Sequence, residues 1–207
     1  LGLQRYICFH NTSPFAYLCS RMKIAIIKYN AGNVASVMYA LDRIGMNYSW
    51  TDEEEEIRTA DKVIFPGVGE ASTAMSHLKE RGLEKVIPNL KQPVLGVCLG
   101  LQLMCKHSEE NDTPCLNIFD IEVKKFPKQS LKVPQMGWNR VSQSREHALW
   151  ADIPDQAYFY FVHSYYVQPE QSAHIVGTTD YGQVFASAVA RDNIFATQFH
   201  PEKSGDA

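Results

Sequence analysis

The sequence predicts an α/β protein: one domain with a doubly wound, mostly parallel sheet and an antiparallel addition. Up to about residue 110, short apolar runs alternate with segments of helical periodicity, which is typical of βαβ units. Beyond that point strand-like segments follow one another with few helical stretches. The chain has 207 residues, of which 45% are hydrophobic, and a chain of this size can bury roughly 70% of its unfolded surface. Intrinsic disorder and a small disulfide scaffold are therefore excluded.

The first part of the chain is expected to place parallel strands between helices. Lys23 to Tyr29 is a short apolar run suited to a buried parallel strand, and residues 30–33 break the pattern. The next helix has apolar residues at three- and four-residue spacing from Val34 to Ile44, and Gly45 favours its end. The alternation then continues, with strands predicted for residues 46–50, 62–65 and 93–97 and helices for residues 71–78 and 101–107. The acidic run at residues 52–56 is interpreted as a solvated loop or helix start rather than a cation site.

The second part is expected to add antiparallel strands. Strand-like segments cover residues 121–126, 157–162, 174–177, 183–190 and 194–199. Arg191, Asp192 and Asn193 are suited to a hairpin turn between the last two of these segments. No internal repeat, low-complexity linker or domain boundary interrupts the sequence, so a single domain is expected.

Both ends of the sequence depart from this pattern. Residues 1–21 show neither strand alternation nor helical periodicity, and no signal-peptide cleavage site follows them. We expect them to be a non-native or disordered leader before a native start at Met22; a genuine N-terminal arm is the alternative. After Ser204 and Gly205 the sequence stops where a new helix would begin, so we expect a truncated C-terminal helix and lower stability than with that helix present.

Charge and cysteine content exclude several classes of function. The net charge of −3 argues against nucleic-acid binding, because phosphate contacts usually need a basic face. No apolar run reaches the length of about 18 residues that a membrane-spanning helix needs. The five cysteines have no CxxC spacing and the histidines no HxxxH pair, so we expect reduced thiols in a cytoplasmic protein with no metal site and no cofactor.

The segment Gly96-Val97-Cys98-Leu99-Gly100 is the most informative one. It is the cysteine form of the G-x-S-x-G nucleophile elbow, in which glycines permit a sharp turn from strand to helix. Such a turn exposes the Cys98 thiol at the carboxyl edge of the sheet, and the helix N-terminus favours the thiolate. The backbone N–H of Leu99 is then placed for an oxyanion. The alternative is an ordinary buried cysteine, which is the interpretation we give to Cys105.

A partner for such a thiol lies near the C-terminal end. His200 and Glu202 flank Pro201, which favours extended backbone, so the two side chains are expected on the same face. Glu202 can then orient His200 while the other ring nitrogen accepts the thiol proton, as in a catalytic triad. The loop at residues 66–69 ends a strand at the same edge, so the region of Val68 could supply a second oxyanion donor; an ordinary turn is the alternative.

Together, G-V-C-L-G and H-P-E resemble the motifs of the class I (triad) glutamine amidotransferases. Further stretches resemble, within that superfamily, the glutaminase subunits of imidazole glycerol phosphate synthase: residues 29–33, 66–69, 96–104, 133–139, 160–166 and 196–205. The resemblance runs in order from Met22 to Ala207, and M-G-W-N and F-V-H-S-Y-Y are the stretches that point to these subunits. It implies the flavodoxin-like fold of the class I glutamine amidotransferases.

The resemblance also implies hydrolysis of glutamine to glutamate and ammonia through a cysteine thioester. The positions that match the family's catalytic triad are Cys98, His200 and Glu202, and those that match its oxyanion site are Val68 and Leu99. Glutamine-binding positions match Gly69, Gln102, Ser164 and Tyr165, and partner-interface positions match Asn33, Tyr160 and Lys203. The implied partner is a cyclase subunit, a (β/α)8 barrel in a heterodimer, which uses the ammonia to make imidazole glycerol phosphate and aminoimidazole carboxamide ribotide.

The residues alone leave alternatives open. Gln102 lies one helical turn beyond Cys98 and could face the same pocket, whereas residues 160–166 could be core aromatics with a capped strand end. Lys28 and Gln135 depart from an Asp and a His that are common in the family. Two other hypotheses remain: a glutaminase serving anthranilate, guanylate or pyridoxal phosphate synthesis, and a non-catalytic scaffold that only binds a partner.

Overall fold

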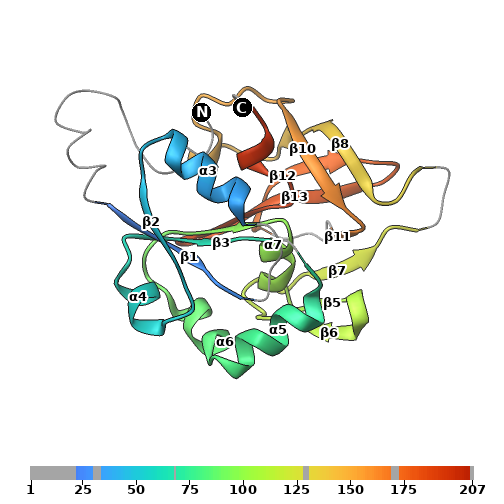
Figure 1. Ribbon diagram of the computed structural model, residues 1–207. Coiled ribbons are helices and arrows are strands. Elements are labelled where there is room, and N and C mark those ends of the chain that lie inside the picture. Colours follow the sequence, from blue (N-terminus) through green and yellow to red (C-terminus); the bar gives the residue numbers. More distant parts are fainter. Residues whose placement is uncertain (1–21, 30–33, 68, 128–130, 169–172, 206–207) are drawn as a thin grey trace.

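The computed structural model describes residues 22–29, 34–67, 69–127, 131–168 and 173–205. The predicted leader lies outside the described residues, as do Asn33 and Val68, two of the predicted site residues. Helices are labelled from α3 and strands from β1 in Figure 1.

Parallel strands form the centre of the sheet, as the sequence predicts. In spatial order they are β2 (Asn47–Thr51), β1 (Lys23–Ile27), β3 (Lys62–Phe65), β4 (Val94–Val97) and β14 (Ile194–Thr197). This is the 2-1-3-4-5 order of flavodoxin-like sheets, and the predicted fold class is confirmed. Because these strands are parallel, their carboxyl ends share one edge, where open α/β sheets bind ligands.

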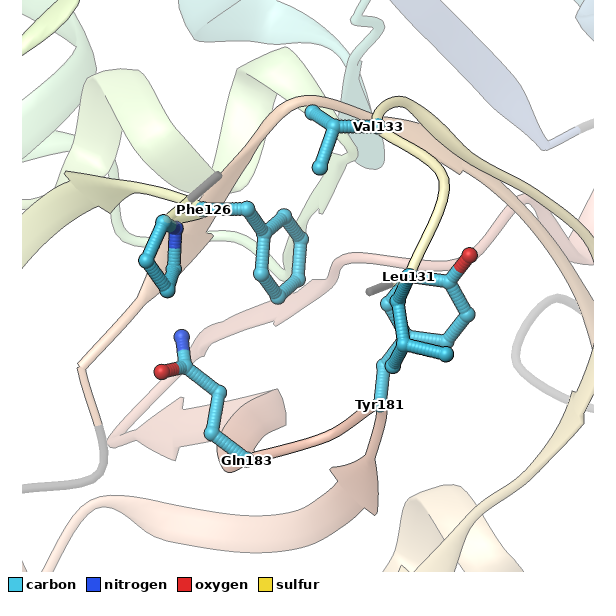
Figure 2. Close-up of a pocket in the computed structure, with 6 residues that line it drawn as sticks. Phe126, Leu131, Val133, Tyr181 and Gln183 are labelled. Carbon is cyan, nitrogen blue, oxygen red and sulfur yellow. The ribbon is translucent and has the colours of Figure 1, made fainter. Parts of the chain in front are cut away.

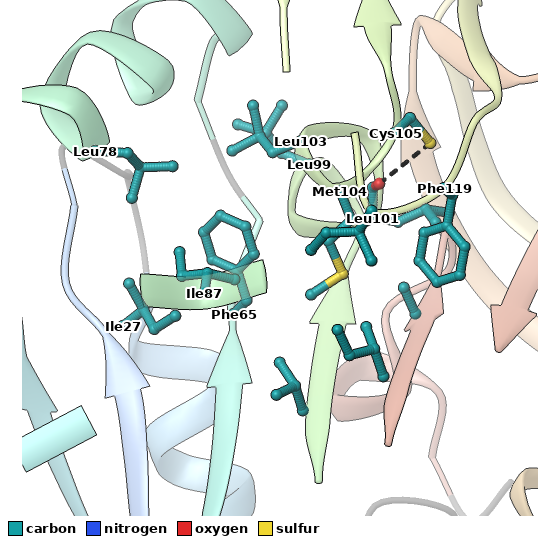
Figure 3. Packing of buried hydrophobic residues seen from close by; sticks show 14 of the residues in the cluster. Ile27, Phe65, Leu78, Ile87, Leu99, Leu101, Leu103, Met104, Cys105 and Phe119 are labelled. Carbon is teal, nitrogen blue, oxygen red and sulfur yellow. Dashed lines mark hydrogen bonds between the residues drawn. The ribbon is translucent and has the colours of Figure 1, made fainter. Parts of the chain in front are cut away.

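Helices cover both faces of this sheet (Figure 1). On one face lies α3 (Ala35–Arg43), and on the other lie α4 (Glu54–Thr59), α5 (Ala71–Glu80), α6 (Leu83–Val86) and α7 (Leu99–Met104). Ile24 and Ile26 of β1 pack with α3, whereas Ile27 packs with Phe65 and Leu78 on the opposite face (Figure 3). This division follows from the alternation of side chains along a strand, which places successive residues on opposite faces.

An antiparallel extension follows, also as predicted. β13 (Val184–Arg191) pairs with β14, β12 (Ile175–Asp180) and β11 (Tyr165–Val167), and Asp192 turns the hairpin to β14 with a φ of +53°. The sheet continues through β7 (Glu122–Lys125), β5 (His107–Ser108) and β6 (Thr113–Pro114), and β9 (Ser142–Gln143) pairs with β12. Short 3-10 helices are η1 (Ile87–Asn89), η2 (Glu110–Asp112), η3 (Ala148–Trp150) and η4 (Pro201–Lys203).

One helix is shorter than its sequence pattern predicts. α7 ends at Met104, so His107 lies in β5 and not in the last turn of a helix. Cys105 is already extended, with a ψ of −178°, and the N–H of Lys106 donates to the carbonyl of Ile121. The chain therefore leaves the helix to join β7. No helix in the described ranges is long and apolar enough to cross a membrane.

A ribbon of β8 (Gln135–Arg140) and β10 (Tyr158–His163) covers an aromatic core. The rings of Phe159 and Phe199 stack with centroids 4.1 Å apart. The sequence pattern does not predict β8, because Gly137 and Asn139 are poor strand formers and pairing with β10 imposes the strand. A small pocket beside this core (Figure 2) is lined by Phe126, Pro127, Leu131, Val133, Tyr181 and Gln183.

Candidate active site

Cys98 lies at a strained turn between β4 and α7. Its φ is +50° and its ψ is −106°, a conformation that residues other than glycine rarely adopt. The N–H of Cys98 donates to the carbonyl of Thr197 at 2.7 Å, which fixes the turn against β14. Backbone strain persists only where the surrounding structure holds it, and it gathers at functional sites. The turn has the form of a nucleophile elbow.

Glycines let the elbow and the loop after β3 pack backbone against backbone. A Cβ on Gly67 would lie 1.9 Å from the carbonyl oxygen of Val97 and 2.3 Å from the nitrogen of Leu99. A Cβ on Gly100 would lie 2.2 Å from the carbonyl oxygen of Phe65. Residues without a side chain are needed at both positions. The loop that the sequence places near the oxyanion site thus contacts the Leu99 amide directly.

His200 and Glu202 make the predicted contact, but not through the extended backbone that the sequence predicts: His200 is extended, whereas Pro201–Lys203 forms the 3-10 helix η4, whose tight turn brings Glu202 back to the ring. Nδ1 of His200 lies 2.8 Å from Oε1 of Glu202, and both side chains are almost fully buried. Nε2 of His200 is also buried, with no hydrogen-bond partner among the described residues. Burial lowers the pKa of His200, but its interactions with Cys98 and Glu202 outweigh burial and raise that pKa to about 10. Glu202 thus holds one ring nitrogen of His200 and leaves the other without a partner among the described residues, the arrangement that a base for the Cys98 thiol would need.

β10 supplies the backbone that contacts both Cys98 and His200. The sulfur of Cys98 lies 3.9 Å from the carbonyl oxygen of Val162, and the N–H of His200 donates to the carbonyl of Tyr160 at 2.9 Å. The hydroxyl of Ser204, just after η4, accepts from the N–H of Tyr160 at 3.1 Å and donates to the carbonyl of His200 at 2.6 Å. One strand thus fixes Cys98 and His200 relative to each other.

Of the predicted glutamine-binding residues, Gln102 and Tyr165 lie in contact. Nε2 of Gln102 donates to the carbonyl of Tyr165 at 3.0 Å. Ser164 directly precedes Tyr165, and its carbonyl accepts from the N–H of Phe126 at 3.1 Å. Gly69 is exposed and has a φ of +127°, in the range that favours glycine. Their role in binding glutamine stays a prediction.

Glu110, which the sequence analysis does not single out, lies beside this group. Its carboxylate accepts from the N–H of Ala71 at the start of α5, at 2.8 Å. Burial raises the pKa of Glu110. Burial and the charges of Glu110, Glu109 and Glu70 raise the pKa of Tyr165. Negative charge therefore gathers next to the predicted glutamine site, although no spacing pattern in the sequence marks Glu110.

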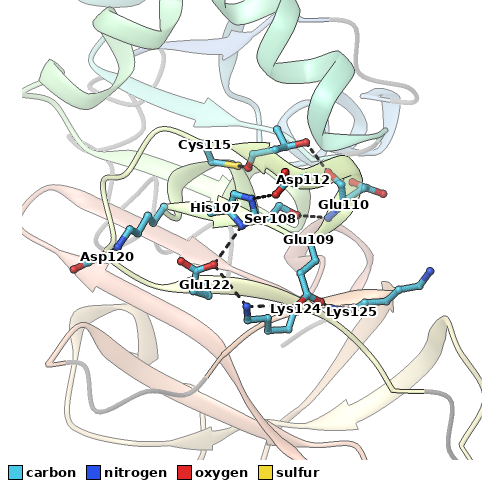
Figure 4. Close-up of polar contacts among 12 residues, drawn as sticks. His107, Ser108, Glu109, Glu110, Asp112, Cys115, Asp120, Glu122, Lys124 and Lys125 are labelled. Carbon is cyan, nitrogen blue, oxygen red and sulfur yellow. Dashed lines mark hydrogen bonds and ion pairs between the residues drawn. The ribbon is translucent and has the colours of Figure 1, made fainter.

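Ion pairs hold the segment that carries Glu110 (Figure 4). Nε2 of His107 lies 2.8 Å from the carboxylate of Asp112, and its Nδ1 lies 3.3 Å from that of Glu122. These contacts join β5, η2 and β7, and β7 pairs with β11, which begins at Tyr165. In the described part of the chain, no group of three or more His, Cys, Asp or Glu side chains could hold a metal ion.

Tyr29 is a second residue that the sequence analysis leaves without a role. Its hydroxyl donates to the carbonyl of Pro66, in the loop that contacts the elbow. Its buried ring packs edge-on against Phe65, with centroids 5.4 Å apart. Burial and the nearby charge of Cys98 raise the pKa of Tyr29. The contact joins two different strands, so no local sequence signal could have indicated it.

The predicted interface residues Tyr160 and Lys203 each make a backbone hydrogen bond with His200. The rings of Tyr160 and Trp138 meet edge-on with centroids 6.1 Å apart. A Cβ on Gly205 would lie 3.8 Å from the Trp138 ring, so the segment after η4 borders the same surface. Lys203 is exposed, and Trp138 is 55% exposed. This surface, defined by Trp138, Tyr160, Lys203 and Gly205, is called the tryptophan face below.

Comparison with known proteins agrees with this geometry. Residues 26–207 match the family described as "Glutamine amidotransferase class-I". A protein of Bacteroides thetaiotaomicron named "Imidazole glycerol phosphate synthase subunit HisH" is 52% identical over 186 residues, which cover 89% of this chain and 93% of that protein. One of the same name from Pasteurella multocida is 46% identical over 184 residues, covering 89% and 92%.

Solved structures share the fold. A glutamine amidotransferase of Thermotoga maritima aligns with a TM-score of 0.65 at 16% sequence identity, over 87% of this chain and 76% of its own. A second structure described as a glutamine amidotransferase aligns with a TM-score of 0.66 at 16% identity, over 86% and 90%. At such low identity the likeness bears on the fold alone.

Proposed function

We propose that Cys98, His200 and Glu202 catalyse the glutaminase reaction of this chain. The chain belongs to the class I glutamine amidotransferases and, among them, to the HisH subunits of imidazole glycerol phosphate synthase. The enzyme hydrolyses glutamine to glutamate and ammonia in histidine biosynthesis. The observation that carries the assignment of residues is the buried His200–Glu202 pair beside the Cys98 thiol at the strained elbow.

Cys98 attacks first. Its sulfur, as the thiolate, forms a bond to the side-chain carbonyl carbon of glutamine, and the carbonyl oxygen becomes an oxyanion. The N–H of Leu99 and the region of Val68 would stabilise that oxyanion, since the preceding Gly67 lies against the Leu99 amide. The imidazolium of His200 then donates its Nε2 proton to the amide nitrogen, which leaves as ammonia. The product is a glutamyl thioester on Cys98.

Water completes the reaction. His200, now neutral, accepts a proton from water as the water oxygen attacks the thioester carbon. The carbon–sulfur bond breaks, glutamate leaves, and Cys98 and His200 return to their starting states. Glu202 keeps the ring oriented through Nδ1. Glutamine itself is proposed to bind at Gly69, Gln102, Ser164 and Tyr165, with its ammonium group toward the acidic side at Glu110.

The tryptophan face is the proposed docking surface for a cyclase subunit. Trp138, Met136 and Tyr158 of the β8–β10 ribbon are exposed apolar side chains on one ribbon, and large exposed apolar groups mark interaction sites. Asp180 and residues 135–139 of β8 help line an open cavity of about 360 Å³ next to them. The tryptophan face includes Lys203 and Tyr160, both predicted from the family resemblance. Ammonia would leave the site on this side.

The partner assignment predicts stimulation of the glutaminase. Glutamate production from glutamine is expected to rise by at least about tenfold when a cyclase subunit is added, since domain closure and loop ordering commonly complete such sites. The measurement is glutamate release with and without the cyclase, and with an anthranilate synthase subunit as the matched comparison. Activity that is independent of the cyclase would favour the glutaminase of another synthase. A folded sample that is inactive in every mixture would favour a binding scaffold.

Glu202→Gln is expected to weaken catalysis and to change the pH dependence of stability. Without the carboxylate, kcat should fall on the order of 10²-fold. The folded-state pKa of His200 is raised from 6.5 to about 10, so its stabilising contribution is complete below about pH 6.5 and is lost as the pH rises through about 10. In urea unfolding, the free energy of unfolding of the wild type should therefore exceed that of the variant by about 2 kcal/mol at pH 6.5, and by less toward pH 10. A difference that is constant over this range would contradict the role of His200.

A further inference from the structure

We propose that Gln198 is a further residue of this active site, whose side-chain N–H donates to the Cys98 sulfur and favours its thiolate. The proposal rests on the glutaminase assignment above, because it gives Cys98 the role of the nucleophile. Gln198 is fully buried, and its Nε2 lies 3.6 Å from Sγ of Cys98. Nothing in the triad mechanism yet uses this amide.

The strand register brings Gln198 to the sulfur. β4 and β14 run parallel with Val97 opposite Thr197, so the next residues, Cys98 and Gln198, lie side by side at the carboxyl edge. The backbone N–H of Gln198 donates to the carbonyl of Ser187 in β13 at 2.9 Å. The position of this side chain is therefore set by two neighbouring strands, and not by a loop.

A chain of buried hydrogen bonds sets which end of the amide faces the sulfur. The carbonyl of Tyr165 can only accept, and Nε2 of Gln102 donates to it at 3.0 Å. The same Nε2 donates at 3.0 Å to Oε1 of Gln198, so the other end of the Gln198 amide, its NH₂ group, must face Cys98. His163 donates from Nδ1 to the same Tyr165 carbonyl at 2.7 Å, which anchors the chain on β10. The orientation thus follows from an acceptor-only group and needs no assumed amide assignment.

A donor at this place favours the charged sulfur. A hydrogen bond to an ionised group is about twice as strong as one between neutral groups, and burial makes it stronger still. The titratable groups that face Cys98 are His200 after β14 and Tyr29 after β1, with His163 of β10 and Glu202 acting through His200. Gln198 is uncharged, so it favours the thiolate at every pH at which the protein is folded.

Alkylation of Cys98 by iodoacetamide tests the proposal without glutamine or turnover. The rate at Cys98 is followed against pH by peptide mass spectrometry in full-length wild type and in Gln198→Met, which keeps the volume and removes the donor. The pH midpoint should rise by roughly one unit in the variant. Gln102→Met, which frees the Gln198 amide to turn, should raise it by less. Gln92→Met, which loses an amide donor to the carbonyl of Ile57 far from the site, should leave it unchanged.

Turnover gives a second readout. In the presence of the cyclase, Gln198→Met should lower kcat about tenfold with KM within about twofold, whereas a purely structural role would reduce only the folded fraction. An unchanged alkylation midpoint in a folded Gln198→Met protein would overturn the proposal. The underlying reaction is tested separately: glutaminase activity should be present in the wild type and lost in Cys98→Ala.

If Gln198→Met does not fold, the proposal can still be tested on the wild-type chain. With ¹⁵N-labelled glutamine side chains, the Gln198 amide resonances of wild type, assigned through contacts with Gln102, should move with the pH midpoint of Cys98 alkylation. The same resonances in Cys98→Ala should not move with pH in that range. Equal behaviour in both proteins would show that the amide does not sense the sulfur and would refute the proposal.

Discussion

Replacement of Cys98 by alanine is expected to abolish glutamate production, with a fall in kcat of about 10⁴-fold or more. The thioester needs a sulfur at the elbow, and Cys105, at the other end of α7, is fully buried with its sulfur 3.4 Å from the carbonyl of Leu101. The measurement is glutamate release in the presence of the cyclase. Stability should change little, because alanine keeps the Cβ and the backbone turn and removes only the sulfur.

Cys105→Ala is the matched control for this experiment. It deletes a thiol from the same helix segment, within the core that Figure 3 shows. A loss of about 1 kcal/mol in the free energy of unfolding is expected, together with full activity. Retention of activity in Cys98→Ala, with this control normal, would remove the catalytic assignment and leave the scaffold hypothesis.

Gly67→Ala is expected to damage both stability and activity. The added Cβ would meet three backbone atoms of the elbow within 3 Å: the Val97 oxygen at 1.9 Å, the Leu99 nitrogen at 2.3 Å and the Gly100 nitrogen at 2.6 Å. Backbone cannot yield as a side chain can, so the loop after β3 must move away from the Leu99 amide. We expect a loss of about 3 kcal/mol in the free energy of unfolding. A displacement of the order of 1 Å should cost about 10²-fold in kcat.

Gly45→Ala separates this steric effect from backbone strain. Gly45 has a φ of +69° and open space around the position of a Cβ. Alanine there should cost about 1 kcal/mol and leave the glutaminase rate unchanged. Thermal unfolding and glutamate release, measured on Gly67→Ala and Gly45→Ala, distinguish the steric effect from backbone strain. Gly67→Ala with wild-type kcat would mean that contact between the loop and the elbow is not required for turnover.

The sequence predicts well those features that depend on local pattern. The alternation of apolar runs and helical stripes is enough to predict the parallel sheet with helices between its strands, although α6 is not among the predicted helices. The elbow around Cys98 is likewise local, since two glycines and a strand-to-helix transition make it. The sequence predicts the pairing of His200 with Glu202 but not its geometry, since the contact is made across the 3-10 helix η4 and not along extended backbone.

What the sequence could not predict depends on register and on distant pairing. Gln198 lies within a stretch that resembles the family, yet only the alignment of β4 with β14 puts its amide on the Cys98 sulfur. The hydroxyl of Tyr29, after β1, donates to the carbonyl of Pro66, after β3. The pairing of β5 with β7 brings Glu110 to the site. α7 ends at Met104 for the same reason, because pairing of the following residues with a neighbouring strand overrides the helical periodicity of the sequence.

The central position of β14 has a consequence for how the enzyme is made. Residues 194–197 pair with β4 on one side and with β13 on the other. During synthesis, one edge of β4 therefore stays unpaired until nearly all the described chain has been made. An open apolar edge can pair with other chains, and such late, distant pairing is slow. Under the proposed mechanism, the same delay would leave Cys98 without His200 while the nascent chain is incomplete. Pairing of the last central strand would then both close the open edge of the sheet and complete the proposed active site.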